Sequence, residues 1–195
     1  MLTIDAARLV RAKQKGLFQE INSEVLNKVI PDNLRDINNH WFGLSIRSRV
    51  IVFSPERVGV EDLIDYQDLS KAKWKGRICV RSSSNIYNQS LVASMIAHYG
   101  IEQTEIWAKG FVKNFARPPK GGDRDQIKAI AAGVCDIALV NNYYLAGMLD
   151  SGQTDEISAA MKTALFWPGQ NKYGAHVNIS GAGVTKFSKN KTEAI

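Results

Sequence analysis

The chain has no long hydrophobic run and little cysteine or histidine. Its 195 residues include 2 cysteines and 3 histidines. No stretch approaches the roughly 20 consecutive apolar residues that a membrane-spanning helix needs, and the first residues lack the basic and apolar segments of a secretory signal. The sequence also lacks GxSxG, P-loop and GxGxxG motifs and a readable cysteine–histidine pairing. We therefore do not expect an enzyme.

The composition is that of a globular protein. Hydrophobic residues make up 45% and charged residues 23% of the chain, which argues against disorder and coiled coil. The 25 basic and 19 acidic residues give a net charge of +6. Basic residues are scattered apart from the cluster at 186–191, which is typical of a solvated face, so we expect no nucleic-acid partner.

Both ends of the sequence predict that the chain is an internal piece of a longer protein. Leu2–Ile4 has the pattern of a strand, with Asp5 capping a helix over Ala6–Gln14. At the other end, Asn190 and Glu193 form the signature of a helix start. A domain seldom opens inside a strand or closes one turn into a helix, so we expect truncation at both ends.

Strands and helices alternate through the middle of the chain. This order predicts an α/β fold with a largely parallel sheet, with ligands at the carboxyl ends of strands. The predicted strands are Ser45–Ser54, Arg77–Arg81, Asn114–Ala116, Val134–Asn141 and Tyr173–Ser180, with a turn at Gly181–Gly183. The predicted helices are Ile86–Tyr99, Thr104–Val112, a helix begun by a capping box of Asp123 and Gln126, and Tyr143–Leu149 capped by Asn142.

Three tyrosines mark two strand-to-helix junctions. Tyr87 follows Cys79 by eight residues, and Tyr143 follows Cys135 by eight, with Tyr144 next to it. If the two strands are neighbours in register, all three phenols open onto one crevice. The alternative for each phenol is a rim or surface position.

Three phenols at one place are suited to a trivalent cation. Phenolates are hard anionic donors, and a pKa near 10 means that a strong Lewis acid must displace their protons. Zinc prefers histidine and cysteine, and calcium prefers carboxylates and carbonyls. Ferric iron fits the phenols better than either metal, and the helix N-termini favour an accompanying anion.

Several segments resemble the ferric-iron-binding proteins of bacterial ABC transporters, and most closely the cyanobacterial type. These segments are HWFGLSIRSRVIVFS (40–54), RSSSNIYNQSLVA (81–93), ARPPKGGDRDQIKAIAAGVCDIALVNNYY (116–144) and HVNISGAGVTK (176–186). The resemblance implies a type II periplasmic-binding-protein fold, with two α/β lobes, a hinge and iron in the cleft. It implies a partial N-lobe over 1–47, a C-lobe over 48–172 and a returning N-lobe segment over 173–195.

The resemblance also implies the ligands and the partners. It assigns Tyr87, Tyr143 and Tyr144 as ferric ligands, with Fe(III) held together with a synergistic anion. Arg47 and Arg49 flank the crossover between the lobes, and Arg47 is the candidate for a cation behind the metal ligands or for an anion partner. The alternative for both arginines is a surface position, which suits Arg49 better than Arg47. The family's other ligands precede residue 1, and none of the three histidines is reassigned to that role. The partner is the permease of an inner-membrane ABC importer, and the location is periplasmic, with the export signal in the missing N-terminal part.

Two alternatives and one covalent feature stay open. The same fold serves carriers of oxyanions or other small solutes and effector-binding domains of cytoplasmic transcription regulators. Cys79 and Cys135 are either bridged across adjacent strands or two buried thiols. We expect the isolated chain to bind iron poorly, because it lacks the upstream ligands.

Overall fold

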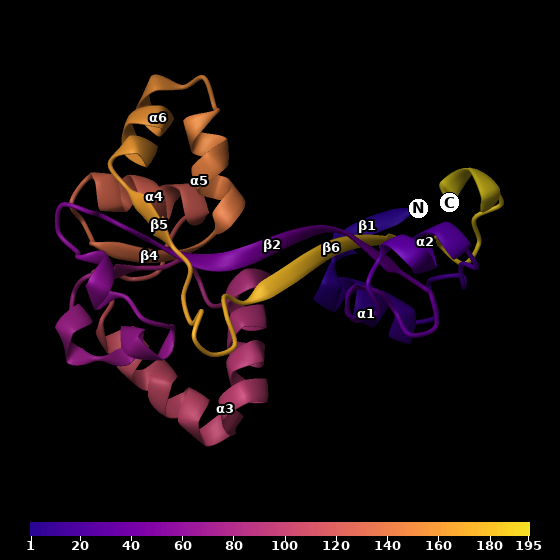
Figure 1. Cartoon of the computed structure of the whole chain (residues 1–195), viewed down its shortest axis with the longest axis horizontal. Helices are drawn as coiled ribbons and strands as arrows, with labels where there is room; N and C mark the ends of the chain where they lie inside the picture. The colour runs from indigo at the N-terminus through magenta and orange to yellow at the C-terminus, as the bar shows by residue number, and fades with distance from the viewer. The chain divides into compact units, whose positions relative to one another are not determined.

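The computed structural model describes residues 1–195, and the chain divides into two compact units (Figure 1). The first unit contains residues 1–47 and 177–195, and the second contains residues 48–176. The strand β2 begins in the first unit and ends in the second. No helix combines the length and apolar character needed to cross a membrane. The strands are β1 (Leu2–Asp5), β2 (Phe42–Phe53), β3 (Ile78–Cys79), β4 (Ile137–Asn141), β5 (Ala164–Phe166) and β6 (Val177–Gly183), and the helices are α1 (Ala6–Gln14), α2 (Glu24–Val29), α3 (Ile86–Lys113), α4 (Asp123–Ala131), α5 (Asn142–Leu149) and α6 (Thr154–Met161).

The first unit is built on the antiparallel pair of β1 and β6, with β6 next to the first half of β2. Helix α1 packs its buried Leu9 against this sheet, in a core that also contains Phe18 and Trp41. The predicted turn at Gly181–Gly183 is wrong, because these residues continue β6. A Cβ atom at Gly181 would lie 2.3 Å from the Phe42 carbonyl oxygen. The glycines therefore serve a close approach of two strands rather than a reversal of the chain.

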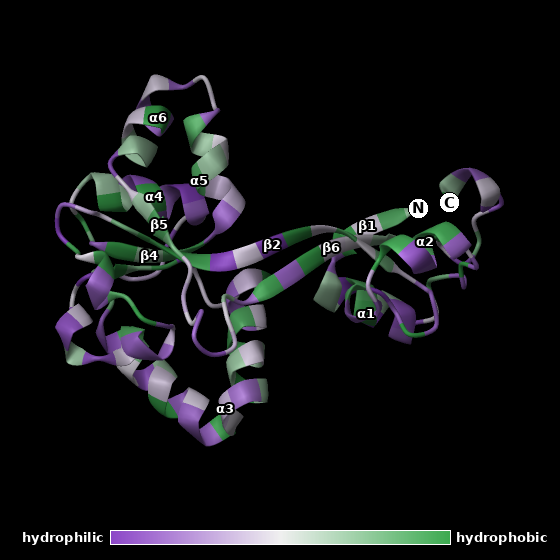
Figure 2. Ribbon diagram, viewed as in Figure 1, coloured by the Kyte–Doolittle hydropathy of each residue, from purple (hydrophilic) through white to green (hydrophobic).

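The second unit has a mixed sheet rather than a largely parallel one. β2 pairs antiparallel with both β4 and β5, and β3 runs parallel to β4. The unbroken apolar run of β4 has the pattern of a strand that is buried on both faces, and the structure confirms this, with β4 parallel to β3 on one side and antiparallel to β2 on the other. Ile137 and Leu139 point into one core, beside α3, and Ala138 and Val140 point into the other, beside α4, α5 and α6. Figure 2 shows the hydrophobic colouring along this strand.

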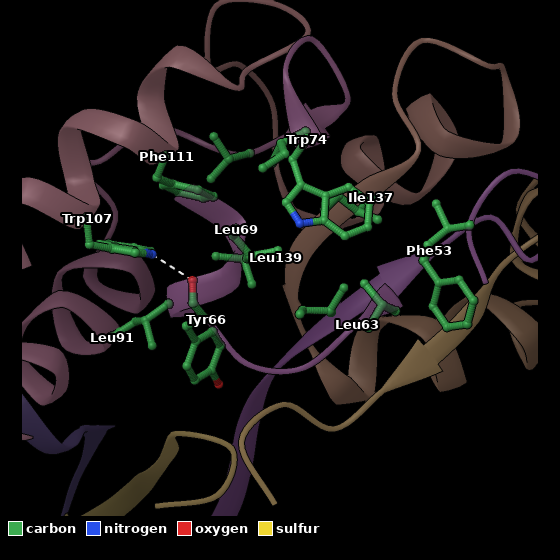
Figure 3. Close-up of a cluster of buried hydrophobic side chains, with 14 of the residues drawn as sticks. Phe53, Leu63, Tyr66, Leu69, Trp74, Leu91, Trp107, Phe111, Ile137 and Leu139 are labelled. Atoms are coloured by element: carbon green, nitrogen blue, oxygen red, sulfur yellow. Dashed lines mark hydrogen bonds between the residues drawn. The ribbon is translucent and has the colours of Figure 1, made fainter. Parts of the chain in front are cut away.

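The core on the α3 side is rich in aromatic residues (Figure 3). Trp74 is 1% exposed, and its ring lies among Leu69, Ile137 and neighbouring aliphatic side chains. Trp107 packs at the α3 edge of this cluster and donates a hydrogen bond from Nε1 to the Tyr66 carbonyl, 2.6 Å away. This core fixes α3 against β4, and so fixes where α3 begins.

Helix α3 contains the break that the sequence predicted at Gly100. The two predicted helices follow each other directly, and Gly100 alone departs from helical geometry, with φ 80° and ψ 167°. Positive φ costs little for glycine, which has no side chain to clash. The two arms of α3 on either side of Gly100 diverge in Figure 1.

Candidate metal centre

Tyr87 lies in the first turn of α3, where the preceding asparagine fixes the helix start. The Asn85 side chain accepts a hydrogen bond from the Tyr87 backbone N–H at 2.9 Å. This is the usual N-cap interaction, which satisfies one of the free N–H groups of the first turn. The Tyr87 side chain is half-buried. Because Tyr87 is the second residue of α3, the capped helix start fixes the position of its backbone.

Tyr143 and Tyr144 occupy the second and third positions of α5. Consecutive helical residues normally diverge by about 100°, but the two ring centroids are 4.4 Å apart with an interplanar angle of 31°. The helix begins one residue earlier than predicted, with Asn141 and not Asn142 as N-cap. Asn142 instead accepts a hydrogen bond from the Ser48 backbone N–H at 3.0 Å. The two phenol rings therefore lie side by side at the start of the helix.

The two junctions meet, as the spacing of the tyrosines predicted, although the register differs. The Tyr87 and Tyr143 hydroxyl oxygens are 3.4 Å apart. The strands before them are parallel neighbours, but Cys79 pairs with Ala138 and not with Cys135. The equal spacing of eight residues between cysteine and tyrosine therefore does not mean that the two cysteines lie opposite each other. The phenols meet because both strands end at the same edge of the sheet.

The structure raises the pKa of the Tyr143 phenol. Burial is the main cause of the raised pKa, and hydrogen bonding with the Tyr144 and Tyr87 hydroxyls adds to it. These hydrogen bonds favour the neutral phenol, because a phenolate has no proton to donate. The Asn141 amide opposes this shift by favouring the anion. Tyr143 without a bound cation is therefore a neutral phenol, and any cation that binds its anionic form must release a proton.

Beneath the phenols lies a buried ion-pair network that the sequence did not reveal. The Asp123 carboxylate is fully buried and pairs with Arg49 Nη1 at 2.6 Å and with Arg81 Nη1 at 3.1 Å. It also accepts the Asn141 backbone N–H at 2.8 Å, and Asn88 accepts from Arg49 Nη2 at 2.7 Å. Each charged group therefore has an oppositely charged partner, as a buried ion needs.

Two predictions about this network are wrong. Arg49 is 2% exposed and is not a surface residue. Asp123 does not cap α4, because its carboxylate is used by the two arginines. Asp125 takes the capping role and accepts the Gly122 N–H at 2.6 Å. A charged side chain within a strand of β-branched residues was the available sign that Arg49 is buried and paired.

The network leaves a surplus positive charge beside Tyr87. Two guanidinium groups face one carboxylate, and the Cζ atoms of Arg81 and Arg49 lie 5.3 Å and 6.0 Å from the centroid of the Tyr87 ring. This positive charge is suited to an anion that accompanies a metal.

Arg47 belongs to the first unit. Its guanidinium forms an ion pair with Asp5 and donates from Nη1 to the Ser180 hydroxyl at 2.6 Å. Its side chain is 8% exposed. Its role as an anion partner stays a prediction.

Outside the phenols, no group of three or more His, Cys, Asp or Glu side chains is placed to hold a metal ion. The three histidines have other contacts. The His40 ring bonds Asp36, His98 stacks on Tyr173 with centroids 3.9 Å apart, and His176 Nε2 lies 2.9 Å from the Ser90 hydroxyl.

Cys79 and Cys135 form a disulfide, which settles the alternative that the sequence left open. Their Cα atoms are 5.8 Å apart and 56 residues apart in sequence. Cys135 precedes β4 and Cys79 ends β3, so the bond joins the parallel pair of strands below the phenols.

A protein-family comparison matches residues 3–195 to the bacterial extracellular solute-binding proteins. The chain is 46% identical to Iron uptake protein A1 of Synechocystis over 195 residues, which is 100% of this chain and 54% of that protein. It is 30% identical to the Fe(3+)-binding periplasmic protein of Serratia marcescens, over 99% of this chain and 55% of that one. The chain therefore spans just over half the length of these curated relatives.

A solved structure from Trichodesmium (IdiA, FutA), in complex with iron and citrate ligands, is similar along almost the whole chain. It superposes with a TM-score of 0.94 at 53% identity, over 97% of this chain and 60% of that one. The predicted two-lobe α/β fold is confirmed by this likeness, and the names of the relatives agree with the predicted ferric-iron binding rather than with the alternatives.

Proposed function

The chain belongs to the bacterial extracellular solute-binding protein family, and we propose that it is the iron-binding part of a carrier that captures Fe(III) with phenolates and delivers it to an ABC importer. The observation that carries the proposal is the meeting of Tyr87, Tyr143 and Tyr144 at the start of two helices, with two of the hydroxyls 3.4 Å apart. Three phenolates carry the charge that balances a ferric ion, and hard oxygen donors suit a hard cation.

Binding is coupled to proton release. Because burial and the neighbouring hydroxyls raise the pKa of Tyr143, iron must displace its proton, and the apparent affinity falls as the pH falls.

The anion and the lobes complete the proposal. The Trichodesmium protein was solved with iron and citrate ligands. We keep Arg47 as the residue of the first unit that pairs with such an anion, which requires its guanidinium to exchange Asp5 for the anion. The proposed lobes are residues 1–47 with 173–195 and residues 48–172, whereas the compact units of the structure change over at residues 176 and 177. The Cys79–Cys135 disulfide is stable in an oxidising compartment, which supports a periplasmic location. The proposed partner there is the inner-membrane permease of the importer.

The test is an iron-affinity series on the 195-residue chain. Ferric citrate is titrated into the wild type and into Tyr87→Phe, Tyr143→Phe and Tyr144→Phe, and bound iron is measured after gel filtration. Each variant should bind at least about tenfold more weakly, because a phenyl ring donates no oxygen to the metal. Tyr173→Phe is the matched control, because Tyr173 is 61% exposed and stacks on His98. Equal binding by all five proteins would refute the proposal.

A further inference from the structure

The second unit contains a cavity that none of the three phenols lines, although it shares Arg81 with the network beneath them. Its volume is about 290 Å³, and it is lined by both arms of α3, by β4 and by the segment from Phe115 to Pro119. The break at Gly100 makes this space, since a straight helix would not return its second arm to the same cavity. The volume is close to the lower end of small-molecule sites, about 300 Å³.

The walls are hydrocarbon, and the largest of them are aromatic rings. Trp107 and Phe111 stack with centroids 4.8 Å apart, and Phe115 meets Phe111 edge-to-face at 4.9 Å. The only polar atom of the Trp107 side chain is occupied, because Nε1 donates to the Tyr66 carbonyl. Figure 3 shows Trp107 and Phe111 side by side on α3 next to Leu91, which also lines the cavity. Flat aromatic rings offer the offset and edge contacts that another aromatic ring prefers.

A single cation lines this apolar space. Arg81 contributes to the wall and is 19% exposed, and its Nη1 alone is engaged, with Asp123. Its Nε and Nη2 make no hydrogen bond within the chain, whereas the Asn88 amide beside it is satisfied by Arg49 and by the Arg81 and Ser82 carbonyls. Asp123 is already paired with Arg49 at 2.6 Å. Two arginines share the one Asp123 carboxylate, so the network has one excess positive charge, and Arg81 is the member of the pair that lines the cavity.

We propose that this cavity binds a small aromatic monocarboxylate, with its ring against Trp107 and Phe111 and its carboxylate on the free N–H groups of Arg81. An apolar body is needed because most of the lining is hydrocarbon, with Ser83 and Asn88 the polar side chains besides Arg81. A negative charge is needed because Arg81 and Arg49 share a single carboxylate, that of Asp123. An arginine–carboxylate pair can form two parallel hydrogen bonds, which orients the ligand. Binding of the aromatic carboxylate needs no iron, so it can be tested on the metal-free chain separately from the proposed ferric centre.

The experiment is calorimetric titration of the metal-free chain with 2-naphthoate as the probe. Saturable 1:1 binding is expected. The neutral analogue 2-naphthalenemethanol should bind at least about tenfold more weakly, because it cannot pair with Arg81. Citrate should not displace 2-naphthoate, because it has no apolar body. Absence of 2-naphthoate binding, or equal affinity for the neutral analogue, overturns the proposal.

Three variants locate the binding in the cavity. Ala108→Phe fills the space, Val112→Trp narrows it from a residue that is 59% exposed, and Arg81→Gln removes the charge. The first two should weaken the binding of both aromatic probes, and Arg81→Gln should weaken only that of 2-naphthoate. Ile106→Phe is the control, because Ile106 is 57% exposed and outside the cavity. Thermal melting identifies folded variants, and unchanged 2-naphthoate affinity in folded Val112→Trp and Arg81→Gln contradicts the assignment.

Discussion

Asp123 is the residue on which the electrostatics of the phenol site depends. Its side chain is completely buried, and it holds two arginines that contact the Tyr87 ring. Asp123→Asn removes the negative charge and leaves Arg49 buried without a counter-ion. Loss of one partner of a buried pair costs about 3–5 kcal/mol, and urea unfolding should show a decrease in stability of that size.

A matched substitution separates burial from charge. Asp155→Asn removes an ion pair with Lys128 in which the Asp155 side chain is 68% exposed. Exposed pairs contribute little, so its unfolding curve should overlay the wild type. An equal decrease in unfolding free energy in the two variants would contradict the claim that the Asp123 ion pairs matter because they are buried.

Asp136 gives the stability of the second unit a dependence on pH. Burial opposes ionisation of its carboxyl, but hydrogen bonds from Arg77 and Arg57 outweigh burial and lower its pKa. A lowered folded-state pKa contributes stability above the unfolded value of about 3.9, and that stability is lost as the pH falls through the folded value.

Asp136→Asn should therefore destabilise the protein by about 1 kcal/mol at pH 7, a small value because its arginine partners are one-third exposed. The difference between variant and wild type should shrink as the pH falls below about 4. Urea unfolding at pH 7 and pH 3 measures the difference in unfolding free energy between variant and wild type. The same difference at both pH values would contradict the lowered pKa of Asp136.

At the scale of elements, the close approach of β6 to β2 depends on glycine. A Cβ at Gly181 would lie 2.3 Å from the Phe42 carbonyl oxygen and 3.0 Å from Leu9. Gly181→Ala should destabilise the first unit by about 1–3 kcal/mol through forced backbone shifts. In contrast, a Cβ at Gly147 in α5 would make ordinary contact with Arg124 at 3.6 Å, so Gly147→Ala should be neutral or stabilising by up to about 1 kcal/mol. Thermal melting of both variants checks the sign of each effect.

The elements show which parts of the fold the sequence can predict. The bounds of α1, the break at Gly100 and the strand before Tyr143 were predictable from local sequence patterns. The capping of α1 was not, because the Asp5 carboxylate makes no capping hydrogen bond and pairs with Arg47 and Arg8 instead. The strand directions were not, because even the nearest paired residues of β2 and β4, Phe53 and Ile137, are 84 positions apart in sequence and local patterns carry no information about such pairing. The phenols were predictable because they follow strand ends. The pairing of Arg49 with Asp123 was not, because the two residues meet only in the folded chain.

At the scale of the whole molecule, the disulfide joins segments 56 residues apart. Closing a loop of this length restricts the unfolded chain and contributes about 2–4 kcal/mol. Reduction should therefore lower the unfolding midpoint of the wild type, and the double variant Cys79→Ala/Cys135→Ala should not respond to reductant. Thiol titration of the unfolded, unreduced protein should find no free thiol, and two free thiols per chain would exclude the bond.

The account as a whole depends on phenolates as the ligands of ferric iron, and the visible absorption spectrum tests this most directly. Adding ferric iron at neutral pH should produce a phenolate-to-iron charge-transfer band, even where affinity is low. The band should weaken or shift in Tyr87→Phe, Tyr143→Phe and Tyr144→Phe, stay unchanged in Tyr173→Phe, and fade as the pH falls, because each ligand regains a proton. Iron that binds without such a band, or with the same band in all the variants, would contradict the account.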